Sequence, residues 1–139
     1  MVFKVVDLEQ SFPLMMDYLL SQDQQKNIYL LKGDLGSGKT TFVKEFVQYL
    51  GGEGVHVDSP TFSIVNTYDF TGKIIHHFDL YRLESLEEIE DIGFMEYIDS
   101  GNTCFIEWPE KIAEFLPIER VVHIGITVSL NECREYSFS

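Results

Sequence analysis

Residues 27–41 read Asn-Ile-Tyr-Leu-Leu-Lys-Gly-Asp-Leu-Gly-Ser-Gly-Lys-Thr-Thr. The first six residues form a nearly continuous apolar run, which is typical of a β-strand that is covered on both faces. The stretch from Gly33 to Thr40 then fits the pattern Gly-x-x-x-x-Gly-Lys-Thr at every fixed position. A strand that leads through such a loop into a helix predicts a site for the phosphates of a nucleotide.

The loop has the composition that close contact with phosphate requires. Glycines let consecutive backbone N–H groups point toward an anion, because glycine adopts positive φ values without strain. A helix that begins near Lys39 adds the partial positive charge of its N-terminus. In such loops the lysine ammonium contacts the β- and γ-phosphates, and the following hydroxyl ligates Mg²⁺. We therefore predict binding of ATP and Mg²⁺ by the residues of this loop and the helix start, which are Gly33, Asp34, Leu35, Gly36, Ser37, Gly38, Lys39, Thr40 and Thr41.

The pattern on either side of the loop predicts strands that alternate with helices. Apolar runs bounded by turn residues are typical of strands, and Thr71-Gly72 is expected to be the turn of a hairpin. The expected strands cover residues 3–6, 27–32, the two arms of a hairpin within 61–80, 103–108, 121–128 and 134–138.

Four helices are expected from caps and hydrophobic spacing. They cover residues 12–20 with Ser11 as N-cap, 39 to about 50, a short acidic segment that starts at Ser85, and a segment from Pro109 to about Leu116. Strands alternating with helices imply an α/β fold. We predict a single P-loop NTPase-like domain over residues 1–139, with a central mixed, mostly parallel sheet flanked by helices.

Two acidic residues end apolar strands. Asp79 ends the run Ile-Ile-His-His-Phe-Asp, and Glu107 ends the run Cys-Phe-Ile-Glu. In an open α/β sheet ligands collect at the carboxyl ends of the strands, so both carboxylates are expected to face the phosphates. Nucleotide hydrolysis needs a carboxylate near the metal and a group that positions water. An acid at a strand end is also commonly a solvated turn residue, and it is the pair that favours a catalytic site. His76 and His77 are predicted to be structural, one pointing inward and one outward.

The chain is strongly acidic, with a formal net charge of -13. This charge argues against non-specific nucleic-acid binding, which depends on Lys and Arg. It is compatible either with a solvated acidic surface or with docking onto a basic partner. Between Leu83 and Glu110 there are nine acidic residues and no basic ones, so this face is a candidate contact. No segment has the length and apolar character of a membrane span or a signal peptide, and the two cysteines suggest no disulfide framework. We expect a cytoplasmic protein that does not contact membranes.

Four blocks of the sequence together resemble a known family. They are Gly-Asp-Leu-Gly-Ser-Gly-Lys-Thr-Thr at 33–41, Ser-Pro-Thr-Phe at 59–62, His-Phe-Asp-Leu-Tyr-Arg-Leu at 77–83 and Ile-Glu-Trp-Pro-Glu-Lys at 106–111. In order and spacing they closely resemble the TsaE (YjeE) family, from about residue 7 to residue 117. The resemblance implies the bacterial ATPase that is required to make N6-threonylcarbamoyladenosine at position 37 of tRNA. Such ATPases act through a threonylcarbamoyl-transfer complex of TsaD and TsaB type subunits, so tRNA is expected to be contacted only indirectly.

The resemblance also implies roles for individual residues. Glu107 would serve at the metal or its water as the principal catalytic carboxylate, with Asp79 supporting the metal site and Lys39 on the phosphates. Thr61 would be a switch residue near the γ-phosphate, and Trp108 would lie beside the nucleotide. The expected catalytic residues are thus Glu107, Lys39 and Asp79, and the expected metal residues are Thr40, Glu107 and Asp79.

Three other functions remain as alternatives. A small metabolite kinase commonly gathers phosphates with a lid rich in arginine, whereas this chain has only Arg82, Arg120 and Arg134, far apart. A GTP-dependent switch protein would carry Asn-Lys-x-Asp, which does not occur here. Direct RNA binding is disfavoured by the negative charge. Arg82 is either an arginine finger or a salt-bridge partner of nearby acids, and hydrolysis by the isolated protein is expected to be slow.

Overall fold

The structure is a computed structural model that describes residues 1–5, 8–22, 25–60, 63–129 and 133–139. Within these residues, seven strands form one sheet with the order β1-β7-β6-β2-β5-β4-β3. The strands are β1 (Val2–Val5), β2 (Ile28–Lys32), β3 (Val65–Phe70), β4 (Lys73–Asp79), β5 (Thr103–Glu107), β6 (Val121–Val128) and β7 (Arg134–Phe138).

The centre of the sheet is parallel and its margins are antiparallel. Strands β6, β2, β5 and β4 run parallel, whereas β3, β7 and β1 pair antiparallel with their neighbours. The predicted α/β fold with a mixed sheet is therefore confirmed. Because β2, β4 and β5 are parallel, the segments that follow them meet at one edge of the sheet, and the register pairs Asp79 with Glu107.

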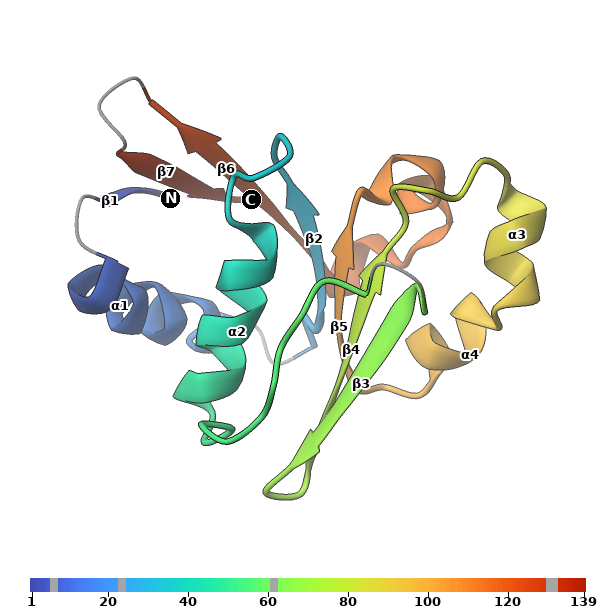
Figure 1. Cartoon of the computed structure of the whole chain (residues 1–139), viewed down its shortest axis with the longest axis horizontal. Coiled ribbons are helices and arrows are strands. Elements are labelled where there is room, and N and C mark those ends of the chain that lie inside the picture. The colour runs from blue at the N-terminus through green and yellow to red at the C-terminus, as the bar shows by residue number, and fades with distance from the viewer. Residues whose placement is uncertain (6–7, 23–24, 61–62, 130–132) are drawn as a thin grey trace.

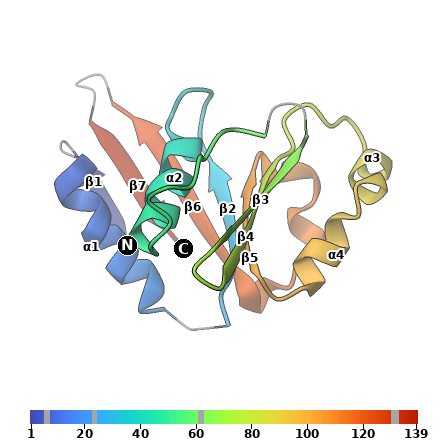
Figure 2. The same cartoon turned by 60° about the horizontal axis from the view of Figure 1, so that its bottom comes forward.

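Helices and turns cover both faces of the sheet (Figures 1 and 2). Helices α1 (Leu8–Leu20) and α2 (Lys39–Tyr49) lie on one face, and α3 (Leu86–Asp91) and α4 (Phe94–Asp99) lie on the other. One hydrophobic core, which includes Phe42 and Phe105, forms beneath α1 and α2, and a second core forms around Phe78 and Ile106. This two-sided cover explains why all residues from Ile28 to Leu31 are apolar and buried. No helix in the described ranges is long and apolar enough to cross a bilayer.

Several local predictions are confirmed. Helix α2 begins at Lys39, directly after the glycine loop. The β3–β4 hairpin turns at Thr71 and Gly72, whose φ values of 47° and 76° suit a tight hairpin turn. Helix α3 follows Ser85, whose side chain accepts a hydrogen bond from the Glu88 backbone N–H at 3.3 Å.

Other local predictions are wrong. Helix α1 begins at Leu8, so Ser11 lies inside the helix and is not its N-cap. Residues 109–120, all of which the structure describes, contain no α-helix and instead form three short 3-10 turns, η1 (Pro109–Lys111), η2 (Ala113–Phe115) and η3 (Ile118–Arg120). The φ of -120° at Ile112 departs from helical values and separates the first two turns. Helix α4 was not expected from the sequence.

The two adjacent histidines of β4 alternate between the faces as expected, but neither points outward into solvent. Strand alternation places His76 and His77 on opposite faces of the sheet, but both are buried because both faces are covered. His76 packs its ring edge-on against Tyr97, with centroids 4.8 Å apart, and its Nδ1 lies 2.8 Å from the Thr67 hydroxyl. His77 is fully enclosed on the face that carries α2.

Candidate nucleotide-binding and hydrolysis site

The glycine loop connects β2 to the first turn of α2. Gly36 and Gly38 have φ values of 78° and 108°, in the left-handed region that favours glycine. A Cβ on Gly33 would lie 2.4 Å from the Ser37 Oγ and 2.8 Å from the Ile126 carbonyl oxygen, so a larger residue does not fit there. The Ser37 backbone N–H donates to the Asp34 carbonyl oxygen at 3.0 Å and closes the turn. The loop therefore has the conformation that its glycine pattern predicts.

Two features of the loop fit an anionic ligand. The Ser37 Oγ is buried and has no hydrogen-bond partner in the described part of the chain, so it is a polar atom available to a bound group. A Cβ on Gly36 would meet nothing within 4 Å, which leaves open space next to the loop backbone. Asp34 and Leu35 are exposed at the tip, and Thr41 is half-buried in the first turn of α2.

Lys39 is held inside the site rather than extended into solvent. It is only 5% exposed, and its Nζ donates to the Gly33 carbonyl oxygen at 2.6 Å. The same atom lies 3.5 Å from the centroid of the Trp108 ring, within cation–π range. Burial lowers the pKa of Lys39, while the carboxylates of Glu107 and Asp79 act in the opposite direction. The ammonium thus contacts the loop and an indole ring, and two acids act on it electrostatically.

Trp108 reaches this position through an unusual backbone conformation. It directly follows β5 and has a φ of 58°, which is uncommon for a bulky residue. Its ring also contacts that of Tyr81, with centroids 4.8 Å apart. Residues held in sparsely populated φ/ψ regions cluster at functional sites. The turn after β5 therefore places an aromatic face against the lysine of the loop.

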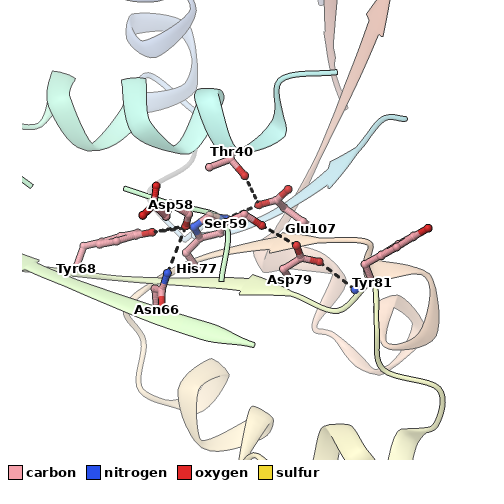
Figure 3. Close-up of polar contacts among 9 residues, drawn as sticks. All are labelled: Thr40, Asp58, Ser59, Asn66, Tyr68, His77, Asp79, Tyr81 and Glu107. Atoms are coloured by element: carbon pink, nitrogen blue, oxygen red, sulfur yellow. Dashed lines mark hydrogen bonds and ion pairs between the residues drawn. The ribbon is translucent and has the colours of Figure 1, made fainter. Parts of the chain in front are cut away.

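Glu107 is the buried carboxylate of the site. It is 3% exposed at the end of β5, and its Oε2 accepts a hydrogen bond from the Thr40 hydroxyl at 3.0 Å (Figure 3). The same oxygen lies 2.5 Å from the Nε2 of His77. A buried charge requires such partners, because its transfer from water is otherwise costly. The first turn of α2 and the end of β5 are thus joined through one carboxylate oxygen.

His77 is a site residue that the sequence reasoning missed, since it was expected to be structural. Its Nε2 faces Glu107, and its Nδ1 lies 3.0 Å from the Tyr68 hydroxyl on β3. That hydroxyl also donates to the Asp58 carbonyl oxygen at 3.2 Å. The sequence contained one usable signal: residues two apart on a strand share a face, so His77 lies on the same side of β4 as Asp79.

Asp79 lies at the end of the neighbouring strand β4 and accepts hydrogen bonds from two nearby segments. Its Oδ2 accepts from the Ser59 hydroxyl at 2.9 Å, and its Oδ1 accepts from the Tyr81 backbone N–H at 3.0 Å (Figure 3). Asp79 is half-buried and register-paired with Glu107. Thr61, the expected switch residue, lies outside the described residues.

One arginine lies at the loop. A Cβ on Gly38 would be 3.0 Å from an Nη atom of Arg134 on β7, so this guanidinium is adjacent to the start of α2. The sequence shows Arg134 only as one of three arginines that lie far apart along the chain. Arg82, the expected finger candidate, is exposed after Tyr81.

The residues suit magnesium better than a metal held only by protein ligands. No group of three or more His, Cys, Asp or Glu suited to a metal occurs among the described residues. Thr40, Glu107 and Asp79 offer one hydroxyl and two carboxylates. Mg²⁺ prefers oxygen ligands, and it usually keeps several waters and is completed by substrate phosphates. The donor set therefore fits Mg²⁺ brought in with a nucleotide.

Comparison with known proteins gives consistent results. The family described as "Threonylcarbamoyl adenosine biosynthesis protein TsaE" matches residues 8–136. Proteins named tRNA threonylcarbamoyladenosine biosynthesis protein TsaE are similar in sequence. The one from Rickettsia conorii is 48% identical over 70% of this chain and 56% of its own length. The one from Haemophilus influenzae is 44% identical over 73% of this chain and 64% of its own length. The one from Bacillus subtilis is 41% identical over 81% of this chain and 69% of its own length.

The chain thus spans less than two thirds of the Rickettsia conorii and Haemophilus influenzae relatives. Among solved structures, YdiB of Bacillus subtilis superposes with a TM-score of 0.70 and 29% sequence identity. The match covers 99% of this chain and 83% of YdiB. The likeness therefore extends through the whole fold.

Proposed function

The chain belongs to the TsaE family, and we propose from this membership that it binds and hydrolyses ATP with Mg²⁺ in the biosynthesis of N6-threonylcarbamoyladenosine in tRNA. The observation that carries the proposal is the hydrogen bond from Thr40 to Glu107, at 3.0 Å. It joins the phosphate loop to a carboxylate that is only 3% exposed. It therefore supplies a carboxylate beside the phosphates and the metal, which hydrolysis of a nucleotide requires.

In the proposed binding mode, the loop from Gly33 to Gly38 surrounds the phosphates with backbone N–H groups. The N-terminus of α2 adds its partial positive charge. Lys39 moves from the Gly33 carbonyl oxygen to a phosphate oxygen, which exchanges a neutral acceptor for a charged one. Trp108 then borders the nucleotide, and the Arg134 guanidinium lies near the loop to interact with its negative charge.

In the proposed reaction, Glu107 orients and polarises the attacking water. Its carboxylate is kept in place by hydrogen bonds and lies in a water-poor region, where electrostatic effects on a reacting group are strong. Thr40 donates its single hydroxyl proton to Glu107, so its oxygen lone pairs remain for Mg²⁺. Mg²⁺, when bound by Thr40 and the nearby carboxylates, would neutralise charge on the phosphates. Asp79 holds the Ser59 segment and contributes negative charge.

The proposed partner is a threonylcarbamoyl-transfer complex with TsaD and TsaB type subunits. The names of the relatives support the pathway, and the net charge of -13 suits a protein that acts through a partner rather than on tRNA directly. We propose that hydrolysis is slow in the isolated protein and is stimulated by these subunits. Since the pathway needs ATP and tRNA, we propose that the protein works in the cytoplasm.

The test is steady-state ATP hydrolysis, measured with and without the transfer subunits. We expect a weak basal rate that rises when the subunits are added. Glu107→Ala should bind ATP with little change and lose turnover in both conditions, because it removes a group that acts mainly in the transition state. Turnover by Glu107→Ala equal to that of the wild type would remove Glu107 from the mechanism. A wild-type rate that ignores the subunits would remove the partner coupling.

A further inference from the structure

Two side chains hold Glu107, and only one of them, Thr40, belongs to the phosphate-loop motif. In the described part of the chain, both protein groups that reach Glu107 meet the same oxygen, Oε2. Thr40 approaches from the first turn of α2, and His77 approaches from β4 (Figure 3). The second carboxylate oxygen, Oε1, is thereby left for a ligand or water.

We propose that His77 is a positioning residue for hydrolysis, which fixes the carboxylate of Glu107 through its Nε2–H. The inference rests on the proposed function, in which Glu107 orients the attacking water. His77 does not touch the nucleotide in this scheme. It orients the carboxylate of Glu107, as a hydrogen-bond partner behind a metal ligand commonly orients that ligand.

The direction of the hydrogen bond follows from the chemistry of the two groups. An ionised carboxylate can only accept, so Nε2 of His77 carries the proton that it shares with Glu107 across 2.5 Å. On the opposite side of the ring, Nδ1 faces the Tyr68 hydroxyl. The Tyr68 hydroxyl lies within hydrogen-bond distance of both Nδ1 and the Asp58 carbonyl oxygen, so the far side of the ring is held in place while Nε2 faces Glu107.

The surroundings make His77 a rigid support. Its side chain has no solvent exposure, and Tyr68, which faces its ring, is 5% exposed. The two residues lie on the paired strands β3 and β4, so the sheet ladder fixes the imidazole and its hydroxyl partner together. Hydrogen bonds in such low-dielectric surroundings are stronger than in water. A carboxylate held by Thr40 alone would lack this second anchor.

The test compares His77→Leu with His77→Gln. Leucine removes both ring nitrogens, whereas glutamine carries an amide NH₂ that can still donate to Glu107. We expect His77→Leu to lower kcat about 10- to 100-fold. The KM for ATP and the affinity for a fluorescent ATP analogue should stay close to wild type, because the phosphate loop is untouched. His77→Gln should recover most of the lost kcat.

His76→Leu is the matched control. It removes a buried imidazole from the same strand, but on the opposite face and away from Glu107. Its melting temperature should fall about as much as that of His77→Leu, whereas its kcat should remain near wild type. Equal loss of kcat in the two leucine variants would assign the effect to stability and overturn the proposal.

A double-mutant cycle separates positioning from an independent role. In a Glu107→Gln background, His77→Leu should reduce the residual rate little further, since the group that His77 positions is already disabled. A second full reduction would overturn the proposal. A wild-type kcat in the single His77→Leu variant would also overturn the proposal. The proposed ATPase function would stand in that case, because the wild-type protein would still hydrolyse ATP.

A spectroscopic readout tests the same contact without turnover. In ¹H–¹⁵N spectra of the imidazole groups, His77 should show an Nε2-bound proton that exchanges slowly with water, because the ring is enclosed. The signal should move or disappear in Glu107→Ala. A His77 with no proton on Nε2, or a signal indifferent to Glu107→Ala, would overturn the assignment. Absence of any ATP hydrolysis by the wild type would instead reject the proposed function itself.

Discussion

The Lys39 ammonium lies 3.5 Å from the ring centroid of Trp108 and donates to the Gly33 carbonyl oxygen at 2.6 Å. The lysine of the phosphate loop is thus already oriented by an aromatic face and a backbone acceptor. A phosphate must compete with both partners for the ammonium. The indole that loses this cation is the only tryptophan in the chain.

Trp108 should therefore report nucleotide binding by its fluorescence. Movement of Lys39 toward the phosphates removes a positive charge from the indole face and changes its emission. We expect a saturable change in intensity when ATP and Mg²⁺ are titrated, and no such change in Lys39→Ala. A calorimetric titration of the same sample provides the check: binding heat with constant fluorescence would contradict the predicted movement.

Lys39→Ala should weaken ATP binding. A hydrogen bond to a charged group contributes about 1.5–3 kcal/mol, which corresponds to roughly a 10- to 150-fold loss of affinity. Equilibrium binding of a fluorescent ATP analogue measures the change. Lys44→Ala is the matched control, because Lys44 is an exposed lysine of the same helix and should keep wild-type affinity. Equal affinity in the two variants would remove Lys39 from the site.

Gly33→Ala should distort the loop. The new Cβ would lie 2.4 Å from the Ser37 Oγ and 2.8 Å from the backbone oxygen of Ile126, and the latter cannot rotate away. Overpacking of this kind costs about 1–3 kcal/mol, so the free energy of unfolding in urea should fall by that amount together with ATP affinity. Gly54→Ala, where a Cβ meets nothing within 4 Å, should change neither quantity. A fully stable, ATP-binding Gly33→Ala protein would contradict the loop geometry.

The two thiols should differ strongly in reactivity. Burial raises the pKa of Cys104 to about 12, while Cys133 is half-buried. Since the thiolate is the reactive form, a disulfide reagent at pH 8 should modify Cys133 first and reach Cys104 only on unfolding. The measurement is the number of thiols that react with and without denaturant. Rapid reaction of Cys104 in the folded protein would contradict its enclosure.

The same pKa shift predicts how stability depends on alkaline pH. The folded-state pKa of Cys104 lies above its ordinary value, so between about 9 and 12 the unfolded chain loses this proton while the folded chain keeps it. The unfolded state then binds fewer protons, and the free energy of unfolding falls as pH rises. Tyr29, whose pKa burial raises from 10.0 to about 12, acts in the same direction. Urea titrations at pH 8 and pH 10.5 should show the decrease, and Cys104→Ala should reduce its size.

Local patterns predicted the parts of the site that lie within one segment. The loop from Gly33 to Thr40 is encoded by its own spacing, and the apolar runs of β2 and β5 reflect cover on both faces of the sheet. The strand expected over residues 103–108 is present as β5, which ends at Glu107, but the helix expected from Pro109 onward is replaced by 3-10 turns. The mixture of polar and apolar residues in that segment does not distinguish these turns from a helix.

Contacts between distant segments were beyond single-sequence reasoning. His77 meets Glu107 because of the β4–β5 register, which follows from tertiary packing rather than from either strand alone. Arg134 reaches Gly38 only through the placement of β7 next to β6. His77 and Arg134 are not part of a local sequence motif that would mark them as site residues.

Asp79 pairs with Glu107 across the parallel strands β4 and β5, so the geometry of the site depends on the register of these two strands. Side chains alternate between faces along a strand, so a shift of β5 by one residue would turn Glu107 away from α2 and toward the layer of α3 and α4. Thr40 and His77 would then face the side chain of a neighbouring residue of β5 instead. Deletion or insertion of one residue between Gly101 and Thr103 should therefore impair the site more than most substitutions do. The sheet could remain intact, but the Glu107 carboxylate would lie on the face that carries α3 and α4.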